Sequence, residues 1–177
     1  MRLGALLAGG RSRRFGTDKA LARLNGQTLL DHAAHALAAY CDSVVVIGHE
    51  ASGYRTLPDW PRAGLGPLGG LAAALRHAAG HGHGEVLAIP VDCLTLPAPL
   101  VDRLSPGPAC LTGQPVIGVW PAALADAIDA FVRTDPRRSM RGFATKVGAR
   151  MIESDFVPPN INTPDDLARM TPGWRLS

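Results

Sequence analysis

Residues 7–19 read Leu-Ala-Gly-Gly-Arg-Ser-Arg-Arg-Phe-Gly-Thr-Asp-Lys and continue a short apolar run, residues 3–8, that has the length of a buried strand. Glycine lets the backbone adopt positive φ and approach an oxygen-rich ligand closely. Successive exposed N–H groups can then form an anion-binding concavity, which the arginines and the lysine would neutralise. The stretch therefore indicates a nucleoside triphosphate site. The alternative is a basic strand-to-helix turn that holds no ligand.

Two other glycine-rich nucleotide motifs do not fit this chain. A P-loop has a glycine, four further residues and then Gly-Lys-Ser/Thr, whereas Gly10 and Gly16 are separated by five residues and Lys19 lies three past the second glycine. Residues 64–69 match the dinucleotide fingerprint letter for letter, but residues 58–62 before them do not resemble a strand. A nicotinamide oxidoreductase is therefore disfavoured, and these glycines are expected to let a loop approach a ligand.

The composition is typical of one globular domain over residues 1–177, with 46% hydrophobic and 19% charged residues. The net charge of +3 comes mainly from arginine, which suits small phosphorylated ligands, while aromatic residues are too few and scattered for a nucleic-acid surface. No apolar run has the length of a membrane span. The N-terminus opens directly into the first expected strand, so we expect a cytoplasmic protein. From the composition and the apolar runs, we expect that it binds neither nucleic acid nor a membrane.

Two groups of residues with potential metal-binding or nucleophilic chemistry are not expected to use it. Cys41, Cys93 and Cys110 are far apart and odd in number, which indicates neither a disulfide framework nor a zinc site. His81 and His83 lie in a glycine-rich segment without a carboxylate or thiolate partner nearby in the sequence. We interpret that segment as a solvated loop.

The first half of the chain alternates apolar runs typical of buried strands with segments in which apolar residues recur at helical spacing. The expected strands cover residues 3–8, 43–48 and 85–92, and the expected helices cover residues 28–38 and 67–79. Asn25 and Gly26 indicate a tight turn, Thr28 and Asp31 indicate a capping box, and residues 49–62 are expected to be irregular. The alternation predicts a three-layer, Rossmann-like α/β fold whose mostly parallel sheet carries helices on both faces.

The second half is less regular. Its expected helices cover residues 97–104, 122–132 and 139–147, and its expected short strands cover residues 109–112 and 115–120, with room for an antiparallel member. A last helix is expected to begin at Pro164 after a Thr163 cap.

Ligands of parallel α/β sheets bind beyond the carboxyl ends of the strands. The loop after residue 8, the segment after Ile47 and Asp92 should therefore meet at one edge of the sheet. Asp92 closes an apolar strand there and is a natural Mg²⁺ ligand together with substrate phosphates, the alternative being a cap or turn residue. Asp59 is placed to accept a hydrogen bond from a base or ribose, or to stand in a surface turn. Asn160 and Asn162 alternate, so both can point the same way, unless they form an Asx turn.

Four segments carry a resemblance to a known family. Residues 7–20 follow the pattern Leu-Ala-Gly-Gly-x-Ser-x-Arg-Phe-Gly-x-Asp-Lys-Ala, residues 66–71 read Gly-Pro-Leu-Gly-Gly-Leu, residues 90–92 read Pro-Val-Asp and residues 160–167 read Asn-Ile-Asn-Thr-Pro-Asp-Asp-Leu. In this order they resemble the molybdenum cofactor guanylyltransferases, within the wider nucleotidyltransferases. The resemblance implies a nucleotidyltransferase fold and Mg²⁺-dependent transfer of GMP from GTP to the terminal phosphate of molybdopterin or Mo-molybdopterin, with release of pyrophosphate.

The resemblance also implies roles for individual residues. By matching position, the nucleotide-binding residues are Leu7, Ala8, Gly9 and Gly10 through the backbone, Lys19 at the triphosphate, Asp59, and Asp92 through Mg²⁺. Asn160 and Asn162 are implied to lie on the acceptor side. Among the arginines of residues 11–14, we take Arg14 as the charge near the leaving pyrophosphate.

The chain departs from the family pattern in several places. Phe15 stands where methionine is usual, and Ile47-Gly48-His49 replaces an asparagine that touches the nucleotide in the family. Cys93 and Leu94 follow Asp92 in place of a small residue and proline, and residues 104–114 are shortened.

Two alternatives therefore stay open: a related nucleotidyltransferase that uses CTP or another phosphorylated acceptor, and a non-catalytic GTP-binding partner in molybdoenzyme maturation. The resemblance also implies transient contact with molybdenum cofactor insertion proteins or apo-molybdoenzymes.

Overall fold

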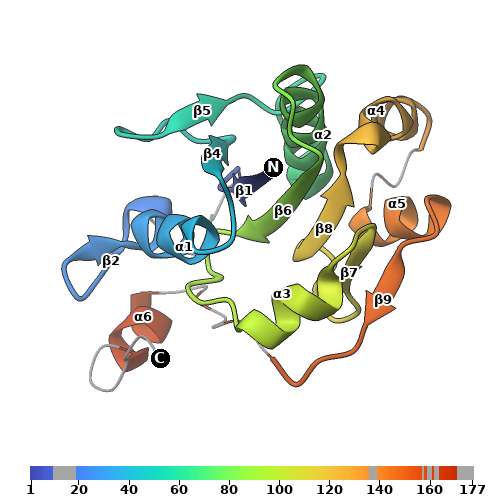
Figure 1. Cartoon of the computed structure of the whole chain (residues 1–177). Coiled ribbons are helices and arrows are strands. Elements are labelled where there is room, and N and C mark those ends of the chain that lie inside the picture. The colour runs from blue at the N-terminus through green and yellow to red at the C-terminus, as the bar shows by residue number, and fades with distance from the viewer. Residues whose placement is uncertain (10–18, 136–138, 157, 159–160, 162–163, 171–177) are drawn as a thin grey trace.

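The structure is a computed structural model that describes residues 1–9, 19–135, 139–156, 158, 161 and 164–170. Its centre is a seven-stranded sheet in the order β5-β4-β1-β6-β8-β7-β9 (Figure 1). The strands are β1 (Arg2–Leu7), β4 (Ser43–Ile47), β5 (Arg55–Leu57), β6 (Glu85–Pro90), β7 (Ala109–Leu111), β8 (Gly118–Pro121) and β9 (Arg150–Ile152). Only β8 runs antiparallel to its neighbours β6 and β7 in this sheet. The predicted mostly parallel sheet with an antiparallel member is confirmed.

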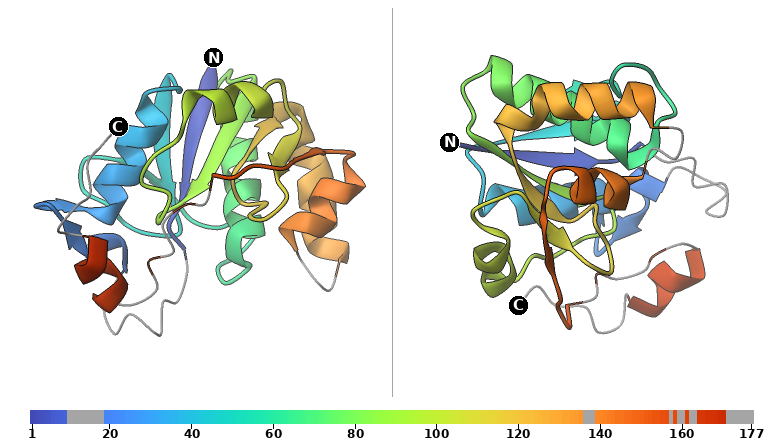
Figure 2. Two further views of the ribbon diagram at one scale, coloured as in Figure 1. Left: turned by 90° about the horizontal axis from the view of Figure 1, so that it is seen from below. Right: turned by 90° about the vertical axis from the view of Figure 1, so that its right-hand side faces the viewer.

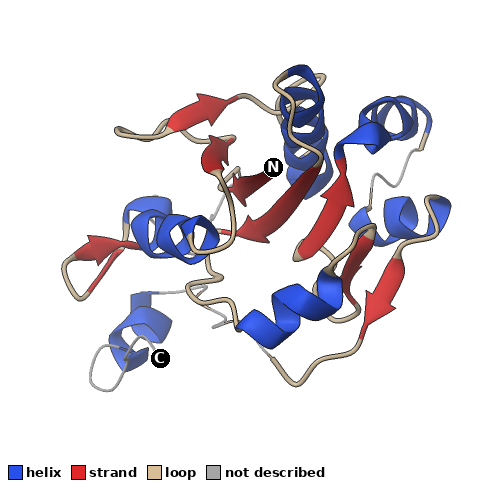
Figure 3. Cartoon of the chain, viewed as in Figure 1, coloured by secondary structure: helices blue, strands red, loops and turns tan. Residues whose placement is uncertain are grey.

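Helices cover both faces of the sheet, as Figures 2 and 3 show. The helices α1 (Leu29–Ala38) and α3 (Ala98–Leu104) contribute to one buried cluster, and α2 (Gly66–Gly80), α4 (Ala125–Thr134) and α5 (Met140–Lys146) contribute to another. The three-layer α/β architecture expected from the sequence is therefore confirmed. None of the helices in the described ranges is long and apolar enough to cross a lipid bilayer.

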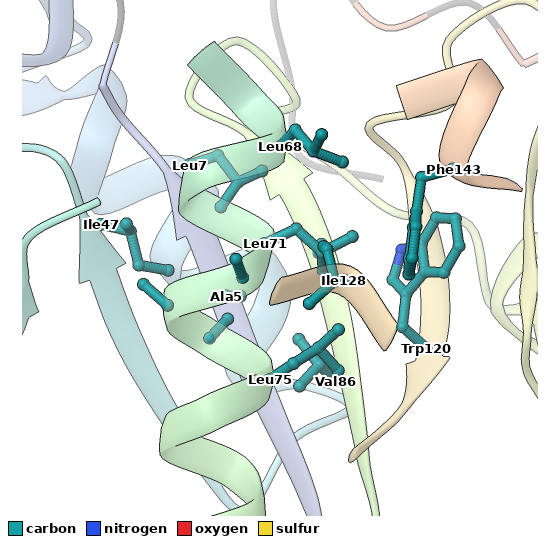
Figure 4. Close-up of a cluster of buried hydrophobic side chains, with 14 of the residues drawn as sticks. Ala5, Leu7, Ile47, Leu68, Leu71, Leu75, Val86, Trp120, Ile128 and Phe143 are labelled. Atoms are coloured by element: carbon teal, nitrogen blue, oxygen red, sulfur yellow. The ribbon is translucent and has the colours of Figure 1, made fainter. Parts of the chain in front are cut away.

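The central strand β1 supplies side chains to both clusters because successive residues of a strand point to opposite faces. Leu3, Ala5 and Leu7 pack with α2 and α4, whereas Leu6 packs with α1 and α3. Figure 4 shows Ala5 and Leu7 among the side chains of the cluster that includes α2, α4 and α5, with Trp120 and Phe143 at its far end. Burial on both faces explains why β1 reads as a continuous apolar run.

The chain between β1 and α1 follows the expected turn and cap. Asn25 (φ 51°) and Gly26 (φ 85°) connect two short strands, β2 (Arg23–Leu24) and β3 (Gln27–Thr28), which pair antiparallel. Thr28 Oγ1 accepts a hydrogen bond from the Asp31 amide at 3.0 Å, and Asp31 Oδ2 accepts one from the Thr28 amide at 3.3 Å. This capping box fixes the first turn of α1.

Several boundaries differ from the sequence-based expectation. Residues 55–57 are a strand rather than irregular chain, and β9 was not expected at all. The expected strand at 115–120 begins only at Gly118, because the Leu111 amide donates to the Ile117 carbonyl and closes a turn. The expected helix at 122–132 is divided into a 3₁₀ turn, η2 (Ala122–Leu124), and α4. The last helix, α6 (Pro164–Met170), does begin at Pro164; its expected cap, Thr163, lies outside the described residues.

Candidate functional site

The carboxyl ends of three parallel strands meet at one edge of the sheet. In the strand register, Leu7 at the end of β1 lies opposite Ile47 of β4 and opposite Pro90 of β6. The residues that follow these strand ends, among them Gly9, Gly48 and Asp92, are therefore brought to the same edge, as the βαβ pattern predicted. In the left view of Figure 2, N marks the start of β1, and this edge lies at the opposite end of that strand.

A close backbone contact between two glycines forms the part of this edge next to β4. The amides of Ala8 and Gly9 both donate to the Ile47 carbonyl oxygen at 3.0 Å, and the Gly48 amide donates to the Leu57 carbonyl at 2.9 Å. Gly48 has φ +77°, and a Cβ placed on it would lie 2.6 Å from the Gly9 Cα. Only glycine fits at position 48, because a side chain would be strained and would also push the Gly9 backbone away.

Asp59 brings a carboxylate against this glycine contact. It lies two residues after β5, and a Cβ built on Gly9 or Gly48 would stand 3.5 Å or 3.3 Å from Asp59 Oδ1. Burial raises the pKa of the Asp59 carboxyl, and a hydrogen bond from the Gly64 backbone partly opposes that rise. A hydrogen-bond acceptor is thus held in a partly desolvated position beside the backbone of residues 8–9.

Lys19 and Asp92 form an ion pair beyond the end of β6. Lys19 opens a 3₁₀ turn, η1 (Lys19–Leu21), and Asp92 follows β6 by two residues. Lys19 Nζ lies 2.9 Å from Asp92 Oδ2, and the side chains are 10% and 17% exposed. A pair that is mostly removed from water places one positive and one negative group where phosphates and a metal ion would arrive.

Asp92 also has the chemistry that a Mg²⁺ ion requires. Mg²⁺ binds proteins through one or two carboxylates, with water and substrate phosphates completing its shell. Within the described ranges, no cluster of three or more His, Cys, Asp or Glu side chains could hold a metal by itself. A single Asp92 carboxylate next to the Lys19 ammonium therefore fits a magnesium ion that would arrive together with a phosphorylated ligand.

The structure shows the surroundings of His81, His83 and Cys93. Cys93 is fully buried, its Sγ donates to the Thr95 carbonyl at 3.4 Å, and burial raises the pKa of its thiol to about 12. His81 is exposed at the end of α2, where its ring lies against that of His77. His83 Nε2 lies 3.4 Å from Ser43 Oγ. The Cys93 thiol is therefore not activated, and within the described ranges none of the three residues belongs to a group of three or more His, Cys, Asp or Glu side chains that could hold a metal ion.

Four predicted site residues lie outside the described residues: Gly10, Arg14, Asn160 and Asn162. Between the two asparagines, Ile161 is described and fully buried, in a small cluster with Leu24, Leu29 and Leu94. Because Leu94 follows Asp92 by two residues, the chain at residue 161 passes close to the Asp92 segment.

Two glycines have structural roles that the sequence did not predict. Gly48 was noted only as part of a departure from a family pattern, whereas it makes the closest backbone contact of the site. Gly70 lets α2 approach β1, since a Cβ there would lie 3.0 Å from Leu7 Cδ2. A glycine directly after a β-branched strand, as in Val44–Ile47 followed by Gly48, was the available signal for the first of these.

Comparisons with known proteins identify relatives that match most of this chain. The family model described as MobA-like NTP transferase domain matches residues 4–147. A molybdenum cofactor guanylyltransferase from Rhizobium leguminosarum bv. trifolii is 37% identical over 93% of this chain and 89% of its own length. A protein of the same name from Rhodobacter capsulatus is 37% identical over 94% of this chain and 93% of its own length.

Solved structures share the fold. The molybdopterin-guanine dinucleotide biosynthesis protein A of Archaeoglobus fulgidus has a TM-score of 0.71 at 20% identity, covering 97% of each chain. The 2-C-methyl-D-erythritol 4-phosphate cytidylyltransferase of Thermus thermophilus has a TM-score of 0.62 at 19% identity, covering 93% of this chain and 94% of that one. Since the second name specifies a cytidylyl group, the fold alone does not select the base, and the choice rests on the site.

Proposed function

The chain belongs to the MobA-like NTP transferase family, and we propose that it transfers GMP from GTP to the terminal phosphate of molybdopterin or Mo-molybdopterin, releasing pyrophosphate. The observation that carries this proposal is the placement of the buried Lys19–Asp92 pair at the same strand ends as the Gly9–Gly48 contact. One part of the edge offers opposite charges for a metal-bound triphosphate. The other offers acceptors for a base.

The reaction needs positioning and charge stabilisation more than proton transfer. An oxygen of the acceptor phosphate attacks the α-phosphorus in line, a new P–O bond forms, and the bond to the leaving pyrophosphate breaks. The attacking phosphate is already an anion at neutral pH, so no general base is required. This explains why a site built from a lysine, carboxylates and backbone groups is sufficient.

Lys19 and Asp92 exchange partners in this scheme. The Lys19 ammonium would donate to the triphosphate, and the Asp92 carboxylate would hold Mg²⁺, which would supply positive charge at the reacting phosphates. Arg14 is proposed to add positive charge near the leaving group, and Gly10 to contribute backbone contact. The buried surroundings of the pair strengthen each of these interactions relative to water.

Recognition of guanine is proposed to use acceptors. The amides of Ala8 and Gly9 already donate to Ile47, so contact through residues 7–9 would use carbonyl oxygens. Asp59 adds a carboxylate beside them. Guanine presents a ring N–H and an amino group as donors on one edge, whereas cytosine presents an amino group alone. A set of acceptors therefore favours GTP over CTP.

The remaining proposals concern the acceptor and the cellular setting. Asn160 and Asn162 are proposed to contact the molybdopterin side, next to Ile161, which packs near the Asp92 segment. A cytoplasmic location is proposed as well. Transient contact with insertion proteins or apo-molybdoenzymes is proposed because the product has to be delivered to an enzyme.

The test is pyrophosphate release by the purified protein with Mg²⁺, comparing GTP with CTP, each with and without molybdopterin. Release that requires both GTP and molybdopterin supports the proposal. Release with CTP would favour the cytidylyl alternative, and GTP binding without turnover in the presence of acceptor would favour a non-catalytic maturation partner. The Asp92→Asn variant serves as the matched inactive control, because the amide preserves the size of the side chain while removing its charge.

A further inference from the structure

The loop that carries Asp59 is held in place by contacts outside the candidate site. Residues 58–65 connect β5 to α2 without regular secondary structure. Asp59 must nevertheless be placed to within a fraction of an ångström if it is to accept from a base. The contacts of the next residue, Trp60, provide that placement.

Trp60 is fixed at its backbone and on its ring. Its amide donates to the Gly69 carbonyl in the first turn of α2 at 3.1 Å. Its indole Nε1 donates to Asp129 Oδ1 at 2.6 Å, and the guanidinium carbon of Arg76 lies 4.0 Å from the ring centroid. The ring is therefore clamped between a cation on α2 and a carboxylate on α4.

Asp129 is itself held so that it keeps its charge and its direction. Arg133, one turn later on α4, donates to it from Nε at 3.2 Å. Burial alone would raise the pKa of Asp129, but the hydrogen bonds from Trp60 and Arg133 and the nearby Arg76 outweigh burial and lower it. The acceptor of the indole N–H is thus an ionised carboxylate, and hydrogen bonds to charged groups are the stronger ones.

The effect reaches Asp59 because the two residues are neighbours in the chain. A Cβ built on Gly69 would lie 3.4 Å from both Asp59 Cβ and the Trp60 carbonyl oxygen, so the backbone of the loop rests directly on the start of α2. The Cα atoms of Asp59 and Trp60 are about 3.8 Å apart, so a shift of the Trp60 backbone that follows the loss of its ring contacts also moves Asp59. Asp59 Oδ1 would then no longer lie against Gly9 and Gly48.

We propose that Asp129, acting through Trp60, is a positioning residue that pre-organises Asp59 for the nucleotide. This inference rests on the proposed nucleotide site, but it assigns a role to a residue of α4 that lies outside that site. Pre-organisation lowers the cost of binding and leaves the chemical step unchanged. Loss of the Trp60–Asp129 bond should therefore weaken GTP binding and raise KM for GTP on the order of tenfold, the scale of one hydrogen bond to a charged group, with kcat nearly unaffected.

The experiment compares four variants. Asp129→Ala removes the acceptor, Trp60→Phe removes the donor and keeps an aromatic ring, and Asp129→Asn keeps an oxygen that can accept from the indole. Asp126→Ala is the matched control, since Asp126 is an exposed aspartate on the same helix. We expect weaker GTP binding by calorimetry in the first two variants, a smaller loss for Asp129→Asn, which keeps the acceptor oxygen without its charge, and a value near wild type for Asp126→Ala. The double variant Trp60→Phe/Asp129→Ala should be no worse than either single one.

A second measurement does not depend on the nucleotide. Amide hydrogen exchange over residues 58–65 in the nucleotide-free protein should become faster in Asp129→Ala and Trp60→Phe and stay unchanged in Asp126→Ala. Unchanged exchange and unchanged GTP affinity in Trp60→Phe would overturn the inference even if Asp129→Ala failed to fold. A wild-type protein that binds no GTP would instead overturn the proposed function, while the exchange data would still judge the role of Asp129 in holding the loop.

Discussion

Lys19 Nζ lies 2.9 Å from Asp92 Oδ2, and this contact ties the segment that leads into α1 to the end of β6. Each member of the pair is also proposed to bind a ligand. A metal ion would compete with Lys19 for the Asp92 carboxylate, and a triphosphate would compete with Asp92 for the Lys19 ammonium. Removing one member leaves the other charge in a mostly buried place without its partner. Both the binding and the chemical consequences of this pair can be measured.

Asp92→Asn is expected to reduce turnover by on the order of 10², the scale of losing one pre-organised electrostatic contact. The amide preserves shape and can still accept from Lys19, so the thermal unfolding temperature should change little. Pyrophosphate release at saturating GTP and acceptor is the measurement. Turnover near that of the wild type would contradict the assignment of Asp92 as the metal ligand.

Lys19→Met is expected to have opposite effects on the two ligands. GTP should bind about tenfold more weakly because an ionic hydrogen bond is lost, whereas Mn²⁺ alone should bind more tightly because Asp92 no longer pairs with a lysine. Calorimetric titration with each ligand separately checks both directions. Weaker binding of both ligands would show that the ion pair does not compete with the metal.

Gly48→Ala should destabilise the fold by about 1–3 kcal/mol, because the new Cβ meets the Gly9 Cα at 2.6 Å and the residue has φ +77°. It should also weaken GTP binding, since the Gly9 backbone has to move. Gly82→Ala is a matched control: Gly82 has the same φ of +77°, but a Cβ there meets nothing within 4 Å. Chemical denaturation and GTP titration of both variants separate strain from contact. Equal effects at the two positions would rule out a special role for the Gly9–Gly48 contact.

Asp59→Asn is expected to stabilise the protein at neutral pH while weakening GTP binding. Burial raises the pKa of Asp59 in the folded state, so folding is favoured by this group below its unfolded-state pKa and that benefit is lost as the pH rises through the folded-state pKa. The asparagine variant carries no such cost, so its advantage over wild type should be present at pH 7 and shrink on acidification toward pH 4. Denaturation curves at both pH values test this. A variant less stable than wild type at pH 7 would contradict the desolvation argument.

The sequence predicted those strands and helices whose buried residues follow a regular pattern along the chain. The strands β1, β4 and β6 are apolar runs because both faces are covered, and the helices α1 and α2 have apolar residues at helical spacing. The edge strand β5 escaped prediction because Arg55 and Thr56 are exposed, and its extended form comes from pairing with β4 rather than from its own side chains. Short exposed strands of this kind carry little local signal.

The candidate site could be predicted residue by residue but not contact by contact. Lys19 and Asp92 were identified separately, yet their pairing joins residues 73 positions apart, and a lysine in a glycine-rich loop gives no indication of its partner. The bond between Trp60 and Asp129 spans 69 positions and involves two residues that no motif includes. The roles of Gly10, Arg14, Asn160 and Asn162 stay predictions.

The reversed direction of β8 affects which segments could be exchanged between this chain and a relative. Because β8 begins where β6 ends, the turn at residues 112–117 lies at the same edge as Asp92, next to the ends of β7 and β9. The segments proposed to hold the nucleotide all precede residue 93, whereas the turn at residues 112–117 and the proposed acceptor residues Asn160 and Asn162 all follow residue 111. With Asn160 and Asn162 proposed for the acceptor, the residues proposed for the two substrates lie on consecutive stretches of chain. A chimera that exchanges the second stretch between relatives is expected to change the acceptor preference and to keep the nucleotide site. Trp60 lies before the point of exchange and Asp129 lies after it, so such a chimera has to preserve the hydrogen bond between these two residues.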